Sequence, residues 1–284
     1  MSFQLRRSSD ADLVLTSEHE IIAKPRKTAI HWDAFLVDDF SPEQLDAAAR
    51  SWGERALQEF HSLALFTQLT TQIHQLGAPL DWSGAFTRMI ADEVRHTDLC
   101  LKFCAKLGRP QPPMVQENEL HLEVRNSLLA HVRSTIIAAF CIGETASGRM
   151  FKRCLQAATV PLAREVVTAI LVDESFHESL GWELAALLMR EITEFERNSL
   201  ADDLPALFAH YARLCGASSG PTWARGQPQN APEPNFGTLT HAGYARAFFE
   251  SMEEDIVPGL VALGFPEATA AFADVVRDLE SQEP

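Results

Sequence analysis

The sequence has few cysteines that could form disulfides or bind zinc, and few basic residues that could bind nucleic acid. It contains five cysteines in 284 residues, an odd number, and no two of them have the Cys-x-x-Cys spacing of zinc knuckles and redox motifs. Basic residues are outnumbered by acidic ones, 24 to 39, which gives a net charge of −15. We therefore expect reduced thiols and no disulfide framework, and we expect neither nucleic acid nor a membrane as a partner.

Long hydrophobic runs are also missing. The longest cover residues 136–143 and 166–172, and both are shorter than the ~20 residues that a membrane-spanning helix needs. Residues 1–15 are polar and do not resemble a signal peptide. These observations predict a soluble, cytoplasmic protein, and the 46 % of hydrophobic residues is enough for an ordinary core.

Regular strand alternation is lacking, whereas helical periodicity is frequent. Ser41, Pro42 and Gln44 have the spacing of a capping box with proline in the first turn, which predicts a helix start. Asp81 is expected to cap the next helix. Five long helical patterns follow one another, at about 41–76, 81–107, 117–158, 161–192 and 193–214.

The composition changes after this helical region. Residues 216–239 are rich in Gly, Pro, Ser and Asn and are expected to form a loop, with two shorter helices near 241–254 and 266–280. The predicted fold class is all-α. We expect an N-terminal arm (1–40), a helical bundle (41–215), and a loop with C-terminal helices that packs on or covers the bundle (216–284).

One short motif occurs twice. The strings are Asp92-Glu93-Val94-Arg95-His96 and Asp173-Glu174-Ser175-Phe176-His177. Residues i and i+3 lie on one face of a helix, so the Glu and the His of each string can reach the same metal ion. A carboxylate beside an imidazole suits iron or manganese.

Two single glutamates complete the pattern. Glu59 lies in the first long helix and Glu144 in the third, directly after an apolar run where a charge needs a partner or a metal. Leu57, Glu59 and Phe66 match Ile142, Glu144 and Phe151, which indicates a repeated two-helix unit. Bundle sites with two metals use one Glu from each of two helices and Glu-x-x-His from each of the other two. The predicted metal ligands are Glu59, Glu93, His96, Glu144, Glu174 and His177.

This pattern resembles the ferritin-like superfamily of dinuclear carboxylate proteins. The string at 92–96 is similar to that of bacterial multicomponent monooxygenases and acyl-carrier-protein desaturases. The resemblance covers about 41–192 and implies a four-helix bundle with additional C-terminal helices. It implies Glu59 and His96 on one metal, Glu144 and His177 on the other, and Glu93 and Glu174 as bridges. It also implies that Asp92 and Asp173 each accept the ring N–H of a ligand histidine, while Arg95 neutralises part of the acidic cluster.

The resemblance implies an O2-dependent oxygenase or oxidase that hydroxylates, desaturates or N-oxidises a small organic substrate in a biosynthetic pathway. Its cofactors would be two iron ions, with O2 as co-substrate; di-manganese or Mn/Fe stays open because the ligand types do not separate them. The sequence has no dinucleotide fingerprint and no cysteine cluster, so an external ferredoxin or flavin reductase is expected. The oligomeric state is open, and a homodimer is compatible with the family. Candidate substrate-pocket residues are Cys100, Phe140, Ser147, Gly148, Phe151 and Ile170.

Other functions compete with this interpretation. The main alternative is a ferritin-like ferroxidase, although the extensions on both sides of the bundle disfavour a closed storage shell. A radical-generating reductase subunit needs a tyrosine beside the metals, and Tyr211 and Tyr244 lie outside the four ligand helices. Ser147 and Ile170 stand where rubrerythrin-like peroxidases and arylamine N-oxygenases carry Glu and His. The net charge disfavours a tRNA hydroxylase, and a metal-free scaffold would bury six ionisable groups without compensation.

Overall fold

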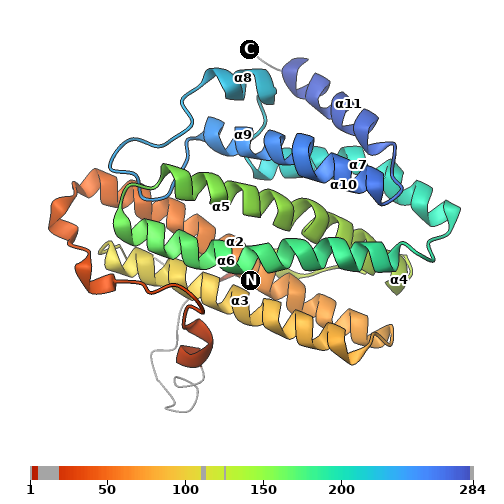
Figure 1. Ribbon diagram of the computed structural model, residues 1–284, viewed down its shortest axis with the longest axis horizontal. Coiled ribbons are helices and arrows are strands. Elements are labelled where there is room, and N and C mark those ends of the chain that lie inside the picture. The colour runs from red at the N-terminus through yellow and green to blue at the C-terminus, as the bar shows by residue number, and fades with distance from the viewer. Residues whose placement is uncertain (1, 6–18, 110–112, 125, 282–284) are drawn as a thin grey trace. The chain divides into compact units, whose positions relative to one another are not determined.

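The computed structural model describes residues 2–5, 19–109, 113–124 and 126–281 (Figure 1). The regular secondary structure of these residues is helical apart from a small antiparallel pair, β1 (Ser2–Gln4) with β2 (Met114–Gln116), and one isolated bridge. The all-α prediction is confirmed. Three-residue strands are too short to show alternation in a sequence, so the β1–β2 pair was not predicted.

The helices are mostly long and come in the expected order. The α-helices are α2 (Pro42–Gln75), α3 (Leu80–Lys106), α4 (Leu128–Thr135), α5 (Thr145–Ala157), α6 (Pro161–Leu188), α7 (Glu194–Leu214), α8 (Gly220–Gly226), α9 (His241–Ser251), α10 (Val257–Ala262) and α11 (Ala268–Ser281). Two π-helical segments are η4 (Ile136–Glu144) and η5 (Met252–Ile256). Short 3-10 turns are η1 (Trp32–Ala34), η2 (Val37–Asp39) and η3 (Glu117–Leu120).

Local capping sets where several helices begin. Ser41 Oγ accepts a hydrogen bond from the Gln44 backbone, and the Gln44 side chain accepts one from the Ser41 backbone, so the predicted capping box is present. Asp81 does not cap α3. The N-cap is Pro79, in extended backbone, which places Asp81 in the first turn, where a carboxylate still favours the positive end of the helix dipole.

The third helical pattern begins later than predicted. Residues 114–124 form β2, η3 and an extended stretch, and α4 starts only at Leu128. The side chain of Gln68 explains this difference. It donates to the Leu120 carbonyl at 2.5 Å and accepts from the Leu122 amide at 3.0 Å, replacing the hydrogen bonds of a helix.

The chain divides into two compact units. The first comprises 1–128 and 160–170, and the second comprises 129–159 and 171–284. In the first unit α2 and α3 lie side by side (Figure 1). Their interface is filled by large side chains such as Trp52 and Phe103, whose ring centroids are 4.3 Å apart. The three-part organisation expected from composition stays a prediction.

In the second unit, α9 packs along α5, and α11 packs on α7, α8 and α10 (Figure 1). Phe208 of α7 meets Phe272 of α11 edge to face, with centroids 6.1 Å apart. The segment predicted as a loop, 216–239, contains α8. The rest of it is ordered around the buried Asn235, whose side chain accepts from Gly237 and Thr238 amides and donates to backbone carbonyls.

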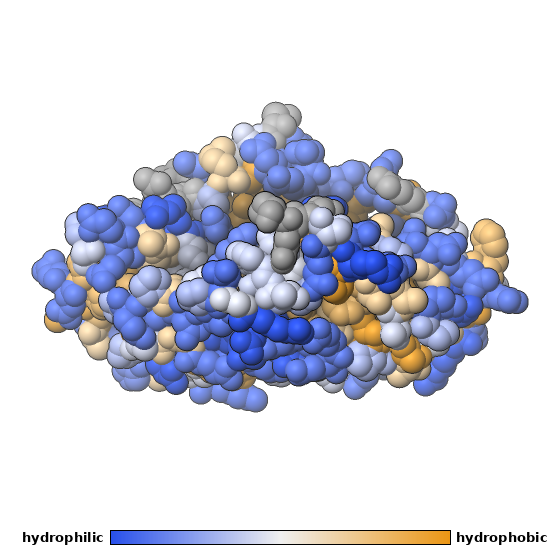
Figure 2. All heavy atoms as spheres, turned by 90° about the horizontal axis from the view of Figure 1, so that it is seen from above, coloured by the Kyte–Doolittle hydropathy of each residue, from blue (hydrophilic) through white to orange (hydrophobic). Residues whose placement is uncertain are grey.

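One continuous helical stretch, Leu128–Ala157, is long and apolar enough to cross a membrane by length and composition alone. Its longest uninterrupted apolar run is still 136–143, which is shorter than a membrane-spanning helix needs. Half of its most apolar window is buried inside the protein, as in the core helices of soluble proteins. The face shown in Figure 2 is mostly hydrophilic, with small groups of hydrophobic residues between the hydrophilic ones. These features are compatible with a soluble protein, and its compartment stays a prediction.

Candidate metal centre

The first unit holds three of the predicted ligands together. Glu93 and His96 lie one turn apart on α3, and Glu59 faces them from α2. His96 Nδ1 is 3.4 Å from Glu59 Oε2 and 3.8 Å from Glu93 Oε2. Each residue offers one ligand atom, and these atoms lie within 4.8 Å of one another. All three side chains are buried. We call Glu59, Glu93 and His96 the first triad.

The second unit repeats this arrangement. Glu144 ends η4, and Glu174 and His177 lie one turn apart on α6. His177 Nδ1 is 3.3 Å from Glu144 Oε2 and 3.9 Å from Glu174 Oε2. The three ligand atoms again lie within 4.8 Å of one another, and the side chains are buried. Glu144, Glu174 and His177 form the second triad, with the same donors as the first.

The donor chemistry of each triad fits a metal ion. Two carboxylates buried beside one imidazole are costly unless a proton or a cation compensates them. Oxygen and imidazole donors together suit iron and manganese, whereas structural zinc sites favour sulfur and nitrogen. These buried Glu and His groups could therefore hold a metal ion, whose identity the donors do not decide. The assignment of all six residues to one dinuclear centre stays a prediction.

Arginine side chains surround the aspartate that precedes Glu93. Asp92 is fully buried, and its Oδ1 accepts from Arg95 Nη1 at 2.6 Å and lies 2.7 Å from Arg26 Nη2. Arg26 Nη1 donates to Oδ2 at 3.2 Å, and Arg88 Nε is 3.6 Å from the same oxygen. Arg95 is also tied to the N-terminal arm by a hydrogen bond to the Lys24 carbonyl. The charge compensation predicted for Arg95 therefore acts on Asp92, while the predicted histidine partner of Asp92 stays a prediction.

The second motif differs at the matching position. Asp173 is buried like Asp92, but Phe176 stands where the first motif has Arg95. The Phe176 ring lies edge-on to the His177 ring, with centroids 6.3 Å apart. The motif of the first triad therefore includes a positively charged residue, Arg95, and the motif of the second triad has an uncharged aromatic residue at the same position.

The residues predicted to line a pocket are distributed over both units. In the first unit Cys100 is buried, and burial, followed by the charge of Glu59, raises the pKa of its thiol; Ile170 is buried as well. In the second unit Phe140 packs against Gly181. The remaining three residues belong to α5, where Gly148 and Phe151 are buried and Ser147 is half-buried. Their role as pocket lining stays a prediction.

Tyr211 is a neighbour of the second triad that the sequence did not reveal. It belongs to α7, outside the ligand helices, yet its hydroxyl lies 3.1 Å from the point where a Cβ on Gly143 would stand. Burial, together with the negative charge of Glu144, raises the pKa of the Tyr211 phenol. Tyr211 thus lies outside the ligand helices, as predicted, but its position on α7 does not keep it away from Glu144. No spacing could have shown this, because 67 residues separate Tyr211 from Glu144.

No family model, curated protein or solved structure matches this chain. The resemblance to the ferritin-like superfamily therefore rests on the repeated motif and on the two buried triads.

Proposed function

We propose that the protein is a non-haem dinuclear metalloenzyme that uses O2 to oxidise a small organic substrate. The two triads would together hold two metal ions, with Glu59 and His96 on one, Glu144 and His177 on the other, and Glu93 and Glu174 shared. The observation that carries the proposal is the repetition of one buried donor set in two units, with matching histidine–carboxylate distances. Reduced iron in such a centre would supply electrons for the reduction of O2.

The geometry and the burial of the triads support this proposal. In each triad the histidine Nδ1 lies 3.3–3.9 Å from an oxygen of each carboxylate, so the three donors converge on one place. Large side chains on the segments that carry ligands, among them Phe86 of α3 and Phe140 of η4, are fully buried, and a site without bulk water needs such surroundings. Ligands held rigidly in dry surroundings are what an enzyme needs to direct a strong oxidant toward a substrate.

Two further parts of the proposal concern partners. The described residues contain five free cysteines and no disulfide, and none of the potential metal-binding groups found among them includes a cysteine. We therefore propose an external electron donor, a ferredoxin or a flavin reductase. The substrate would be a small organic molecule that is hydroxylated, desaturated or N-oxidised.

Metal content tests the centre first. Wild-type protein made in iron-supplemented medium should contain about two iron or manganese ions per chain by plasma mass spectrometry. The variants His96→Ala and His177→Ala should each lose metal, and a Glu93→Ala/Glu174→Ala double variant should contain none. His74→Ala is the matched control, because His74 lies on α2 but bonds Ser83 and belongs to neither triad. Wild-type protein that takes up no metal during reconstitution would refute the proposal.

Oxygen consumption then tests the reaction. The reduced, metal-loaded protein should consume O2 faster with one member of a substrate panel, and His177→Ala should abolish the increase. A ferroxidase would instead consume O2 in proportion to added Fe(II) far beyond two ions per chain and accumulate ferric mineral. That outcome would replace the oxygenase proposal by the iron-handling one.

A further inference from the structure

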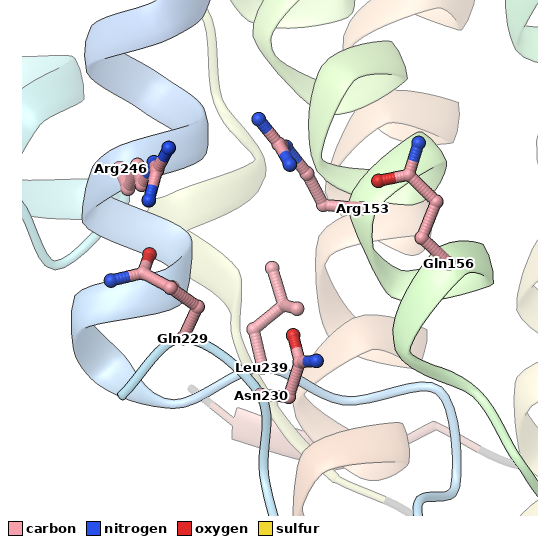
Figure 3. Close-up of a pocket in the computed structure, with 7 residues that line it drawn as sticks. Arg153, Gln156, Gln229, Asn230, Leu239 and Arg246 are labelled. Atoms are coloured by element: carbon pink, nitrogen blue, oxygen red, sulfur yellow. The ribbon is translucent and has the colours of Figure 1, made fainter. Parts of the chain in front are cut away.

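A pocket opens in the second unit between α5, α9 and the segment 227–240 (Figure 3). Its volume is about 140 Å³, enough for a small molecule rather than a single water. Two arginines, three amide side chains and one leucine account for most of the wall: Arg153, Arg246, Gln156, Gln229, Asn230 and Leu239. We propose that this pocket binds a small organic anion through its carboxylate or phosphate group.

The charge of the pocket wall is opposite to that of the whole chain. The chain carries a net charge of −15, yet no aspartate or glutamate lines the pocket, and two arginines do. The guanidinium group of arginine is planar and carries several donors, which suits carboxylate and phosphate oxygens. A local positive wall in an acidic protein points to an anionic ligand.

Glu250 pairs with both guanidinium groups and is not one of the residues that line the pocket. Arg153 donates from Nε and Nη2 to Glu250 Oε2, at 3.1 and 2.5 Å, and Arg246 Nε donates to Oε1 at 2.9 Å. Arg153 Nη1 and both Nη atoms of Arg246 make no hydrogen bond to any residue that the structure describes. One carboxylate thus orients two cations, leaves a net positive charge, and leaves donors for a ligand.

Amide groups add neutral donors beside the arginines. Figure 3 shows Gln156 on the α5 side and Asn230 at the base of the pocket, near Leu239. Within the described part of the chain, neither amide side chain makes a hydrogen bond. Gln229 differs, because its Nε2 donates to the carbonyls of Ala224 and Gln227 and so fixes the segment. Gln156 and Asn230 are therefore available to a ligand, while Leu239 offers a small apolar surface to its carbon skeleton.

The pocket is built before any ligand arrives. The Asn235 amide donates to Thr159 Oγ1 at 2.9 Å, and the Thr159 amide donates to the Asn235 carbonyl at 3.0 Å, which joins the segment to the end of α5. On the other wall, Gly243 of α9 lies against the carbonyl of Gln229, where a Cβ would not fit. A preformed site loses little conformational freedom on binding.

Titration calorimetry with inorganic phosphate and a set of small mono-, di- and tricarboxylates tests the site. At least one probe should bind the wild type, and Arg246→Gln should weaken that binding about tenfold or more, the effect expected of one charge-assisted contact. Glu250→Gln should strengthen it, because glutamine keeps an oxygen that accepts from a guanidinium group while the opposing charge is lost. Arg277→Gln is the matched control, since Arg277 pairs with Asp274 on an exposed face of α11, and it should bind like the wild type.

Several results would overturn the proposal. The first is that no probe binds at concentrations up to about 10 mM, which would detect even a millimolar Kd. Equal binding by Arg246→Gln and Arg277→Gln is another, and weaker binding by Glu250→Gln is a third. If Arg246→Gln fails to fold, Gln156→Leu and Asn230→Leu replace it: both change exposed residues, and both should weaken binding several-fold. The site does not depend on the metal triads, so the metal measurements and these titrations can fail independently.

Discussion

The contact between Gly181 and Phe140 gives a sharp test of how the second triad is positioned. A Cβ on Gly181 of α6 would lie 2.5 Å from the Cβ of Phe140 and 3.2 and 3.3 Å from two ring atoms. A Cβ is fixed to its backbone, so a change of side-chain rotamer cannot relieve the first of these contacts. Gly181→Ala must therefore push η4 away from α6.

The size of the effect follows from two opposing terms. Alanine in place of a helical glycine stabilises by roughly 0.5–1 kcal/mol, and overpacking a filled core costs about 1–3 kcal/mol. Because the backbone has to move, the larger costs apply, and we expect a net loss of ~1–2 kcal/mol, or a few degrees in Tm. Gly53→Ala on α2 is the matched control: no atom lies within 4 Å of its added Cβ, so it should stabilise by up to ~1 kcal/mol.

Urea denaturation of both variants measures the stabilities, and metal content links them to the site. Phe140 lies one turn before Glu144, and Gly181 lies one turn after His177. Gly181→Ala should therefore lower the metal content of the second triad, whereas Gly53→Ala should retain the wild-type content.

A second substitution isolates the contact. In a double-mutant cycle, Phe140→Gly should cost clearly less in the Gly181→Ala background than in the wild type, because it removes the Cβ that the added methyl group would meet. If Gly181→Ala is as stable as Gly53→Ala, or if the two changes are additive, the close contact between η4 and α6 does not hold the ligands and the reasoning is refuted.

Two further predictions concern single ion pairs. Glu196→Gln should destabilise by about 1–2 kcal/mol at neutral pH, because the buried Arg133 loses the carboxylate that accepts from its Nη1 at 3.0 Å. The hydrogen bond from the Thr193 backbone, followed by those from the Thr193 hydroxyl and from Arg133, lowers the pKa of Glu196. The wild type should thus be more stable than Glu196→Gln by the full amount at pH values above about 4.3, the ordinary pKa of a glutamate, and this difference should disappear as the pH falls through the lowered pKa of Glu196. Urea denaturation of both proteins from pH 7 to pH 3 measures the difference, and a constant difference would contradict the prediction. Arg26→Leu removes one of the arginines that bind Asp92, the neighbour of Glu93, and a competing chelator should take metal from this variant about tenfold faster or more. Lys27→Leu is the control and should release metal at the wild-type rate. Equal rates in the two variants would show that the Arg26–Asp92 ion pair does not help to hold the metal.

Local signals predicted much of the fold. The helix that starts at Ser41 was predicted to within two residues because its capping box lies within four residues of sequence. The Glu and His of each motif meet because three residues make almost one helical turn, which needs no knowledge of the tertiary structure. Glu59 and Glu144 were found by their spacing and by the repeat, and each lies 3.3–3.4 Å from its histidine.

Contacts between distant segments could not be predicted in this way. Gln68 holds residues 120–122 out of a helix across more than 50 residues of sequence. Arg26 reaches Asp92 from an arm without periodicity, and Tyr211 approaches Gly143 from a helix that carries no ligand. In each case a tertiary contact overrides or supplements a local preference. Such contacts between distant residues cannot be read from the pattern of a single sequence.

The π-helical geometry of η4 makes the length of this helix part of the ligand arrangement. A π-helical turn contains more residues than an α-helical turn, and η4 ends at Glu144. Deleting one residue between 136 and 143, with the π-helical geometry otherwise kept, would rotate every side chain beyond the deletion about the helix axis by the angle that one residue spans. Glu144 would then turn away from His177 although no residue of the triad had changed. The number of residues in this segment therefore matters as well as their identity, because it sets the direction in which Glu144 points. A one-residue insertion or deletion here should lower metal binding far more than one in the connection between α7 and α8.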